Sequence, residues 1–377
     1  MKFQRLLQNT LQEWLSKREI KVVYGPRQVG KTTLIRDLLT TYEPTDIITL
    51  SGDLISDREQ FDFTHGQSVE KFIGKAKVLF IDEAQRFTNI WINLKIVYDR
   101  QLPIQIIVTW SSSLDIATTI HEPLTGRMVA WNLYPISVGE LLLTYHQSEL
   151  RKIVPRLLVY GSYPDILLAD DATVQLKLQY LTSNYLYKDV IEYAEIRKSD
   201  MIVKLLKLLA FQVWSEVSYH ELGQQLWLNM GTVQKYIDLL EKSYIIHRLG
   251  SWSRNLRNEI KKWVKIYFWD LGVRNCLIND YRPFEMRQDA GGLRENFIIN
   301  EYIKSYAYAW KQANFYFWRT HTQQEIDLLI ESQGWLQPIE IKLSTPKKEI
   351  LPSSFAWWYA HQELHVVTPQ TFLAYLK

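Results

Sequence analysis

The chain has 377 residues, of which 47% are hydrophobic, and its 44 Lys and Arg against 41 Asp and Glu give a net charge of +3 at pH 7. This length exceeds what one hydrophobic core usually serves, so we expect two or three domains. The small net charge excludes an argument for nucleic-acid binding from overall charge. The single cysteine, Cys276, excludes an internal disulfide and favours a reducing compartment. No window approaches 18 uninterrupted apolar residues, so we expect a cytoplasmic protein with no membrane partner.

The first predicted element is an amphipathic helix over about residues 2–16. Phe3, Leu7, Leu11 and Trp14 mark one face of this helix. Because an apolar helix face must be buried against another element, we expect the helix to pack beside a sheet.

A glycine-rich motif follows a short β-branched strand at residues 20–24 and precedes a predicted helix at residues 33–39. The motif fits the pattern G-x-x-x-x-G-K-S/T. A strand that leads through a glycine-rich turn into a helix directs backbone N–H groups and the helix N-terminus at one point, which is an anion site. The candidate nucleotide-binding residues are Gly25, Pro26, Arg27, Gln28, Val29, Gly30, Lys31, Thr32 and Thr33.

Two residues of this motif have predicted roles toward ATP and Mg²⁺. Lys31 would reach the β- and γ-phosphates, and the Thr32 hydroxyl would ligate Mg²⁺. After Lys77, an apolar run at residues 78–81 ends in Asp82 and Glu83. Strands of this kind present such carboxylates at the edge where a P-loop opens. Asp82 would hold Mg²⁺ through water, and Glu83 would act as the general base. An acidic pair after a strand is often a turn or helix cap, but with a P-loop upstream it indicates a Walker B motif.

Serines follow the next predicted strand, residues 104–109. A hydroxyl of Ser111 or Ser112, at the tip of the strand beside the Walker B strand, can contact the γ-phosphate or the attacking water. An ordinary serine-rich helix cap is the alternative.

Arg127 precedes another predicted short strand at residues 128–133. An arginine at this place can serve as a finger to the ATP of a neighbouring subunit. A surface salt bridge is the alternative.

These motifs resemble the AAA+ ATPases that carry a C-terminal domain of unknown function, DUF4143. The segments that carry the resemblance are residues 25–32, 79–85, 111–114, 124–127, 133–137, 161–165 and 187–190. One departure is Trp110, where the family pattern has glycine before the sensor serines, and it leaves the choice between Ser111 and Ser112 open.

The resemblance implies an α/β fold in which a P-loop AAA+ parallel sheet with a helical lid is followed by a winged helix and a restriction-endonuclease-like domain. The expected boundaries are an ATPase core at residues 1–134, a lid at 135–195, a winged helix at 196–262 and a PD-(D/E)xK-like domain at 263–377. It also implies a homo-oligomeric ring.

The predicted winged helix has two short helices joined by residues 227–230 and followed by a strand at residues 245–249. A DNA-reading version would offer Thr232, Gln234 and Lys235 from its second short helix to a groove. Domains of this layout also serve as adaptors that bind protein.

A basic segment follows, where the wing would lie. Between residues 254 and 265, five basic side chains stand against Glu259 alone, and tryptophans flank them, which suits contact with a phosphate backbone. The basic residues are Arg254, Arg257, Lys261, Lys262 and Lys265. A solvated hairpin with a lysine-rich edge is the alternative.

Acidic residues recur near the C-terminus. Glu340 and Lys342 share one face of a predicted strand, Asp327 can sit opposite them on the neighbouring strand, and Glu295 lies on a helix upstream. The set resembles the PD-(D/E)xK nuclease core, in which carboxylates hold Mg²⁺ against the scissile phosphate and a lysine orients water. Spacing alone favours the alternative, a polar hairpin face with an Asp327 to Lys342 salt bridge, and such a fold can bind DNA without cutting it.

From these observations we expect a Mg²⁺-dependent ATPase that couples hydrolysis to the binding or remodelling of duplex or branched DNA. One alternative is a metal-dependent DNA nuclease gated by ATP. Another is a nucleotide-switched scaffold that binds protein partners.

Overall fold

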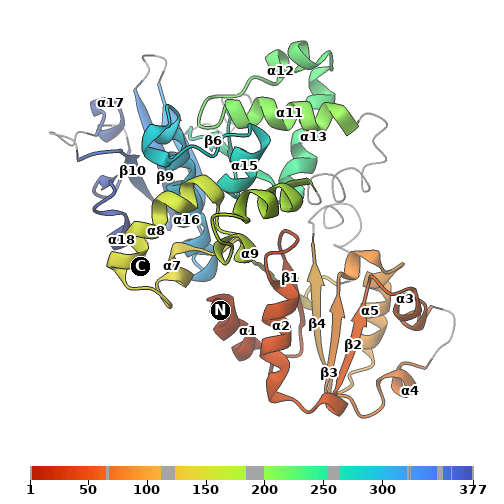
Figure 1. Cartoon of the computed structure of the whole chain (residues 1–377). Coiled ribbons are helices and arrows are strands. Elements are labelled where there is room, and N and C mark those ends of the chain that lie inside the picture. Colours follow the sequence, from red (N-terminus) through yellow and green to blue (C-terminus); the bar gives the residue numbers. More distant parts are fainter. Residues whose placement is uncertain are drawn as a thin grey trace. The chain divides into compact units, whose positions relative to one another are not determined.

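The computed structural model (Figure 1) divides into two compact units. The N-terminal unit consists of Gln4–Tyr134 with Lys242–Tyr244, and the C-terminal unit consists of Met1–Phe3, Pro135–Glu241 and Ile245–Lys377. The residues that the structure describes are 2–64, 68–111, 124–183, 199–253, 264–320, 322, 324–345, 351–357 and 359–375.

The N-terminal unit is built on a five-stranded sheet in the order β2-β3-β4-β1-β5, and every pairing in it is parallel. Its strands are β1 (Ile20–Tyr24), β2 (Ile47–Ser51), β3 (Val78–Asp82), β4 (Gln105–Trp110) and β5 (Met128–Asn132). Because parallel strands end at the same edge, the residues that follow β1, β3 and β4 meet there. The predicted α/β fold with a parallel sheet is therefore confirmed.

Five α-helices accompany this sheet in the described part of the chain: α1 (Leu7–Trp14), α2 (Lys31–Leu38), α3 (Ile55–Gln60), α4 (Val69–Ile73) and α5 (Ile90–Asp99). Short 3-10 turns occupy Leu39–Thr41, Pro44–Asp46 and Ala84–Arg86. The first helix is shorter than expected. Leu7 and Leu11 are buried on α1 as predicted, but Phe3 belongs to the core of the C-terminal unit.

The C-terminal unit contains a six-stranded mixed sheet in the order β11-β10-β9-β8-β6-β7. Its strands are β6 (Ile246–Ser251), β7 (Val264–Phe268), β8 (Asn314–Arg319), β9 (Glu325–Ser332), β10 (Trp335–Ile341) and β11 (His365–Val367). The hairpin strands β6 and β7 are antiparallel, and β6 also pairs in parallel with β8. The strands expected to flank the wing therefore belong to the same sheet as the C-terminal strands.

The helices described in the C-terminal unit are α7 (Val138–Leu141), α8 (Gln147–Tyr160), α9 (Pro164–Leu167), α11 (Ser199–Phe211), α12 (Tyr219–Leu226), α13 (Met230–Lys242), α15 (Leu271–Leu277), α16 (Ala290–Tyr308), α17 (Ser353–Ala356) and α18 (Phe372–Tyr375), with a 3-10 turn at Phe284–Met286. The long helix α16 contacts α8, α15 and β10, and its buried side chains share one apolar core with Phe317, Leu328 and Ile339 of the sheet. Across the described residues, no helix is long and apolar enough to cross a membrane.

Candidate nucleotide-binding site

The loop between β1 and α2 has a backbone that two glycines make possible. At Gly25, φ is 149°, and a Cβ there would lie 2.2 Å from the carbonyl oxygen of Leu133. Gly30 has φ of 97° and stands directly before α2. Both values lie in a region that glycine adopts without steric cost. The sequence motif therefore forms the turn that its glycines predicted.

The N-terminus of α2 directly follows this loop. The helix begins at Lys31, and Gly30 before it has no side chain to cap the first turn. The first N–H groups of a helix have no partner within the helix, so they can bind an anion. The Lys31 side chain is 4% exposed, and its Nζ donates hydrogen bonds to the carbonyls of Gly25 and Pro26 at 2.8 and 2.9 Å. Its charge is thereby placed within the loop.

Arg5 supports the same loop from the chain before α1. Its guanidinium donates to the carbonyl of Val29 at 2.7 Å and to the carbonyl of Tyr134 at 2.6 Å, and the residue is 6% exposed. The sequence patterns did not indicate this role, because residues far apart in the chain make the contact.

Thr32 and Asp82 are brought together as the motifs predicted. The Thr32 hydroxyl contacts both carboxylate oxygens of Asp82, at 3.0 and 2.9 Å. Thr109 of β4 donates its hydroxyl to the same carboxylate at 2.5 Å. A hydroxyl and a carboxylate are the hard oxygen ligands that Mg²⁺ prefers, so these residues fit a magnesium ion.

Glu83 follows β3 in a left-handed backbone conformation, with φ and ψ both 50°. Its N–H donates to the Thr109 hydroxyl at 3.0 Å, and Gly52 leaves room for its carbonyl, since a Cβ on Gly52 would lie 2.2 Å from that oxygen. Non-glycine residues in this conformation carry strain, which occurs often at functional sites.

The Glu83 carboxylate has partners that keep it ionised. Burial would raise its pKa, but the Lys31 ammonium and hydrogen bonds from Gln85 and Ser111, together with Arg27, hold the pKa below its ordinary value. The Gln85 amide donates to Glu83 Oε2 at 2.5 Å and to the Ser111 hydroxyl at 2.6 Å. An ionised carboxylate can accept a proton from water, as a general base must.

Trp110, the residue that departs from the family pattern, is the last residue of β4. Trp110 is 1% exposed and stacks on Trp91, with ring centroids 4.6 Å apart and planes 17° apart. A large ring therefore fills the core where the family pattern has glycine. Ser111 is buried beside Gln85, and Ser112 lies outside the described residues. Sequence reasoning did not select Gln85 or Thr109, although Gln85 stands within the quoted Walker B segment.

Arg127 directly precedes β5, whose first residue, Met128, is paired with Ile20 at the start of β1. It is thus at the opposite end of the parallel sheet from the P-loop of its own chain. Its Nε is 3.1 Å from Asp99 Oδ1 in a partly exposed ion pair. This is the salt bridge named as the alternative, and the finger role stays a prediction.

Thr33, the last of the candidate nucleotide-binding residues, is exposed on α2.

In the C-terminal unit, the acids predicted for a nuclease-like site lie near one another. Asp327 of β9 accepts the N–H of Ile341 at 2.7 Å, and Lys342 lies 2.5 Å from Glu340 and 3.9 Å from Asp327. The Asp327 to Lys342 salt bridge of the alternative interpretation is therefore present. Burial, followed by the charge of Asp327, raises the pKa of Glu340 to about 7.

A second lysine pairs with two more acids of this cluster. Lys265 of β7 is buried, and its Nζ is 2.9 Å from Glu295 and 2.5 Å from Glu325. Tyr267 also donates to Glu295, and burial raises the pKa of Glu295 to about 7 despite the opposing charge of Lys265. The described residues contain no group of three or more His, Cys, Asp or Glu placed to hold a metal ion. Four acidic side chains, Glu295, Glu325, Asp327 and Glu340, thus lie around two lysines, Lys265 and Lys342. The nuclease alternative stays a prediction.

The position of Lys265 corrects one sequence prediction. The local charge pattern places this lysine in the basic wing, but its ammonium points into the acidic cluster and is not available to a phosphate backbone. The prediction failed because β7 places Lys265 on the buried side of the sheet. The remaining basic residues of the segment, Arg254, Arg257, Lys261 and Lys262, lie outside the described residues.

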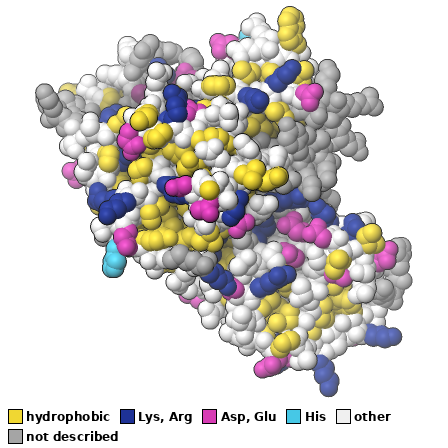
Figure 2. Space-filling model, in the orientation of Figure 1, with side chains coloured by type: hydrophobic (Ala, Val, Ile, Leu, Met, Phe, Trp, Pro, Cys, Tyr) yellow, Lys and Arg dark blue, Asp and Glu magenta, His cyan; other side chains and the backbone are white. Residues whose placement is uncertain are grey.

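The predicted DNA-reading residues of α13 differ in their surroundings. Gln234 and Lys235 are exposed. The N–H and the hydroxyl of Thr232 contact the side-chain oxygen of Asn229 at 2.8 and 3.0 Å, so Thr232 takes part in capping the helix. On the face shown in Figure 2, Lys and Arg side chains are interspersed with Asp and Glu.

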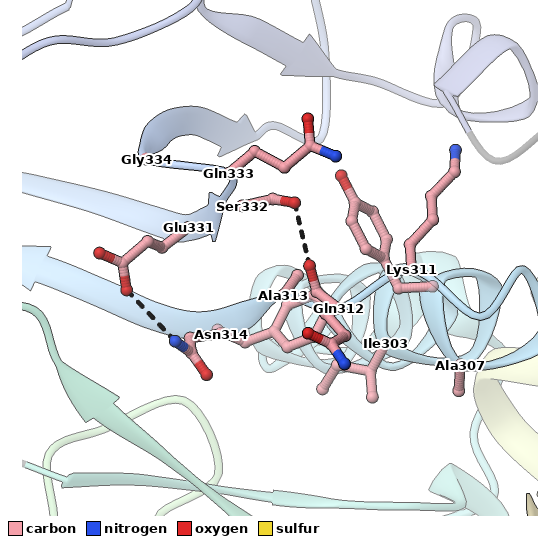
Figure 3. Close-up of a pocket in the computed structure, with 12 residues that line it drawn as sticks. Ile303, Ala307, Lys311, Gln312, Ala313, Asn314, Glu331, Ser332, Gln333 and Gly334 are labelled. Atoms are coloured by element: carbon pink, nitrogen blue, oxygen red, sulfur yellow. Dashed lines mark hydrogen bonds between the residues drawn. The ribbon is translucent and has the colours of Figure 1, made fainter.

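A separate hollow of about 690 Å³ lies at the end of α16, beside the loops that join to β8 and connect β9 to β10 (Figure 3). The Asn314 amide donates to Glu331 at 3.3 Å, and the Ser332 hydroxyl donates to the Gln312 carbonyl at 2.9 Å. Lys311 lies near its rim, over the ring of Tyr306. The lining is polar and open, and it contains none of the residues that the sequence motifs selected.

Comparison with protein families gives three matches. Residues 17–142 match an AAA domain, residues 151–282 match a domain of unknown function (DUF8612), and residues 290–375 match a second domain of unknown function (DUF4143). The AAA match includes the P-loop, Asp82 and Glu83, and it supports ATPase activity. The DUF4143 match agrees with the resemblance drawn from the sequence.

Similar curated proteins include an uncharacterised protein of Mycobacterium tuberculosis, which is 24% identical over 350 residues, 89% of this chain and 73% of that protein. An uncharacterised protein of Methanocaldococcus jannaschii is 23% identical over 332 residues, 83% of this chain and 72% of its own length. An uncharacterised protein of Haemophilus influenzae is 21% identical over 292 residues, 72% of this chain and 73% of its own length.

Two solved structures are distantly similar. The Pif1 helicase of Candida albicans has a TM-score of 0.28 and 14% identity, with 48% of each chain covered. A signal transduction ATPase with numerous domains and a tetratricopeptide repeat sensor, from Pyrococcus horikoshii, has a TM-score of 0.28 and 10% identity, with 78% of this chain and 45% of that chain covered. The chain thus spans less than half the length of either structure.

Proposed function

We propose that the chain hydrolyses ATP with the help of Mg²⁺ at the carboxyl edge of the five-stranded sheet. The observation that supports this most strongly is the pairing of Thr32 with Asp82 beside a Glu83 carboxylate that is held ionised. A phosphate cradle, hard oxygen ligands and a base then lie at one sheet edge, which is what phosphoryl transfer to water requires.

Each residue of the site has a defined task. The first turn of α2 and the Lys31 ammonium bind the phosphates and offset the charge that develops on them. Thr32 and Asp82 would hold Mg²⁺, which when bound neutralises charge on the phosphate oxygens. Glu83 accepts a proton from the attacking water.

Steady-state ATP turnover of the wild type, Lys31→Ala and Glu83→Gln tests this function. We expect Lys31→Ala to lose nucleotide binding, and Glu83→Gln to bind ATP with turnover reduced by about 100-fold or more, because the amide cannot accept the proton. Lys71→Ala, on the exposed surface of α4, is the matched control and should keep full turnover. Turnover in Lys31→Ala equal to that of the wild type would overturn the proposal.

We further propose that hydrolysis is coupled to duplex or branched DNA. Support comes from the basic segment at residues 254–263 and from the exposed Gln234 and Lys235 on α13. ATP turnover is measured without DNA, with a linear duplex and with a four-way junction. Stimulation by one DNA form would name the partner, whereas turnover that ignores all three would favour the nucleotide-switched scaffold.

The same proposal includes a homo-oligomeric ring in which Arg127 reaches the ATP of the next subunit. Arg127→Ala and Lys31→Ala should each be inactive alone, because one lacks the finger and the other lacks a working P-loop. Mixing them should restore part of the turnover, since intact P-loops then meet intact fingers. A mixture as inactive as its components, or an active Arg127→Ala, would exclude the finger role.

A further inference from the structure

Gln85 connects the base of the candidate site to the end of the neighbouring strand. Its single amide nitrogen donates to Glu83 Oε2 at 2.5 Å and to the Ser111 hydroxyl at 2.6 Å. Its amide oxygen faces the Ser111 N–H at 3.4 Å. The contacts thus join the residue that follows β3 to the residue that follows β4.

The orientation of the Glu83 carboxylate depends on these contacts. The backbone of Glu83 is held by Thr109, but the carboxylate lies beyond several rotatable bonds, and a hydrogen bond from an amide removes that freedom. Gln85 engages the Oε2 atom of this carboxylate, and Ser111 gives the carboxylate a second side-chain hydrogen bond, so both groups that Gln85 joins act on the base.

We propose that Gln85 is a positioning residue that sets the orientation of Glu83 and ties it to Ser111, so that a displacement at the end of β4 moves the base. The inference rests on the proposed hydrolysis of ATP. Gln85 itself does not contact the reacting atoms. A partner that shifts Ser111 therefore changes turnover without entering the phosphate cradle.

An amide suits this task for a chemical reason. Glutamine donates two hydrogens at every pH, one to the carboxylate and one to the hydroxyl. A glutamate at the same place is of the same size, but it would put two carboxylates in contact at neutral pH. Two such acids share one proton at lower pH, and the bond between them is then restored.

The variants Gln85→Ala and Gln85→Glu test the proposal by ATP turnover, with KM and kcat measured separately. We expect Gln85→Ala to lower kcat about 10- to 100-fold with KM within twofold of the wild type, because a misplaced base slows the chemical step and leaves the phosphate cradle intact. Gln12→Ala, exposed on α1, is the matched control and should equal the wild type.

The pH profile separates positioning from a merely structural role. The turnover of Gln85→Glu relative to the wild type should rise at least fivefold between pH 8 and pH 6, since protonation restores the bond to Glu83. A flat relative profile would overturn the proposal. This variant keeps the volume of the side chain, so the test remains usable if Gln85→Ala fails to fold.

Two further outcomes distinguish this inference from the function on which it rests. Wild-type protein without ATP turnover, or Glu83→Gln as active as the wild type, would refute the proposed function. Wild-type turnover that Glu83→Gln abolishes and Gln85→Ala leaves unchanged would refute the positioning role alone.

Discussion

The guanidinium of Arg5 donates a 2.7 Å hydrogen bond to the carbonyl of Val29, in the middle of the P-loop. A second bond from the same group reaches the carbonyl of Tyr134, beyond the last strand of the parallel sheet. One buried cation thus joins the phosphate loop to the two ends of the N-terminal unit. Bonds from an ionised donor are stronger than those between neutral groups, so this contact stiffens the loop before a ligand arrives.

Replacing Arg5 should therefore weaken nucleotide binding. In Arg5→Met we expect the Kd for ATP to rise about tenfold, because the carbonyl of Val29 loses a charged donor and the loop must be ordered by the ligand. Calorimetric titration with a non-hydrolysable ATP analogue measures the effect. Arg36→Met, on the exposed face of α2, should bind as the wild type does. Unchanged affinity in Arg5→Met would show that the loop holds its shape alone.

The Thr109 hydroxyl is predicted to be needed for both stability and turnover. It donates to Asp82 and accepts the N–H of Glu83, and the residue is fully buried. Thr109→Val keeps the shape and leaves a buried N–H unpaired, which costs about 1 to 3 kcal/mol of unfolding free energy. We also expect at least a tenfold loss of ATP turnover. Thr49→Val, exposed on β2, is the control, and equal losses in both variants would contradict the prediction.

His247 should make the C-terminal unit less stable as the pH falls. Burial lowers its pKa from 6.5 to about 4, and its Nε2 contacts Asn300 Oδ1 at 2.7 Å. The unfolded chain binds a proton below pH 6.5 and the folded chain does not until about pH 4. The stability that His247 contributes is therefore present above pH 6.5 and is lost as the pH falls through this window, by about 2 kcal/mol between pH 7 and 5.

The His247→Gln variant isolates this effect. Glutamine keeps a donor for Asn300 and does not titrate. Glu295 and Glu340, whose pKa values are raised to about 7, act in the opposite direction in both proteins, so they cancel in the comparison. Urea unfolding at pH 7 and pH 5 should show the smaller loss in the variant. Equal losses of unfolding free energy in the two proteins would mean that protonation of His247 does not destabilise the folded state.

Lys265 is predicted to be essential for the stability of the acidic cluster. Its side chain is 4% exposed between Glu295 and Glu325, and removing one partner of a buried ion pair costs about 3 to 5 kcal/mol. Lys265→Met should be less destabilising at pH 6 than at pH 8, since a proton can then replace the lysine charge on Glu295. Lys311→Met, at an exposed lysine, is the control. A Lys265→Met protein as stable as the wild type at pH 8 would contradict the prediction.

Removing the buried charge of Arg294 should stabilise the protein, whereas removing that of Lys265 destabilises it. It is 5% exposed, its Nε has no hydrogen-bond partner within the described part of the chain, and burial lowers its pKa to about 10. The guanidinium lies over the Phe372 ring, 5.9 Å from its centroid, and a contact of this kind offsets only part of the cost of a buried charge. Arg294→Met should therefore stabilise the protein by about 1 kcal/mol or more. Arg287→Met, which removes an equally buried arginine bound to Asp289, should destabilise it. The Tm of each variant is measured by thermal unfolding and compared with that of the wild type. A lower Tm for Arg294→Met would refute this prediction.

Local patterns in the sequence predicted the parallel sheet and the pairing of the P-loop with the Walker B acids. Neighbouring residues specify a buried strand, a glycine turn and the start of a helix. The carboxyl ends of parallel strands lie at one edge of the sheet, regardless of the segments that connect the strands. The contact of Thr32 with Asp82 followed from those two facts alone. The choice of Glu83 as base rested on the same reasoning, and its lowered pKa agrees with that role.

The tertiary structure alone decided the partners of these residues. Arg5 reaches Val29, Thr109 reaches Asp82, and Gln85 reaches Ser111. Such contacts depend on which strands and side chains become neighbours after folding, and no periodicity in the sequence encodes them. The same holds for Lys265, which local charge density assigned to a basic surface and which the pairing of β6 with β7 and β8 turns toward Glu295. Sequence patterns specify which elements form, whereas the pairing of distant strands determines which charges meet.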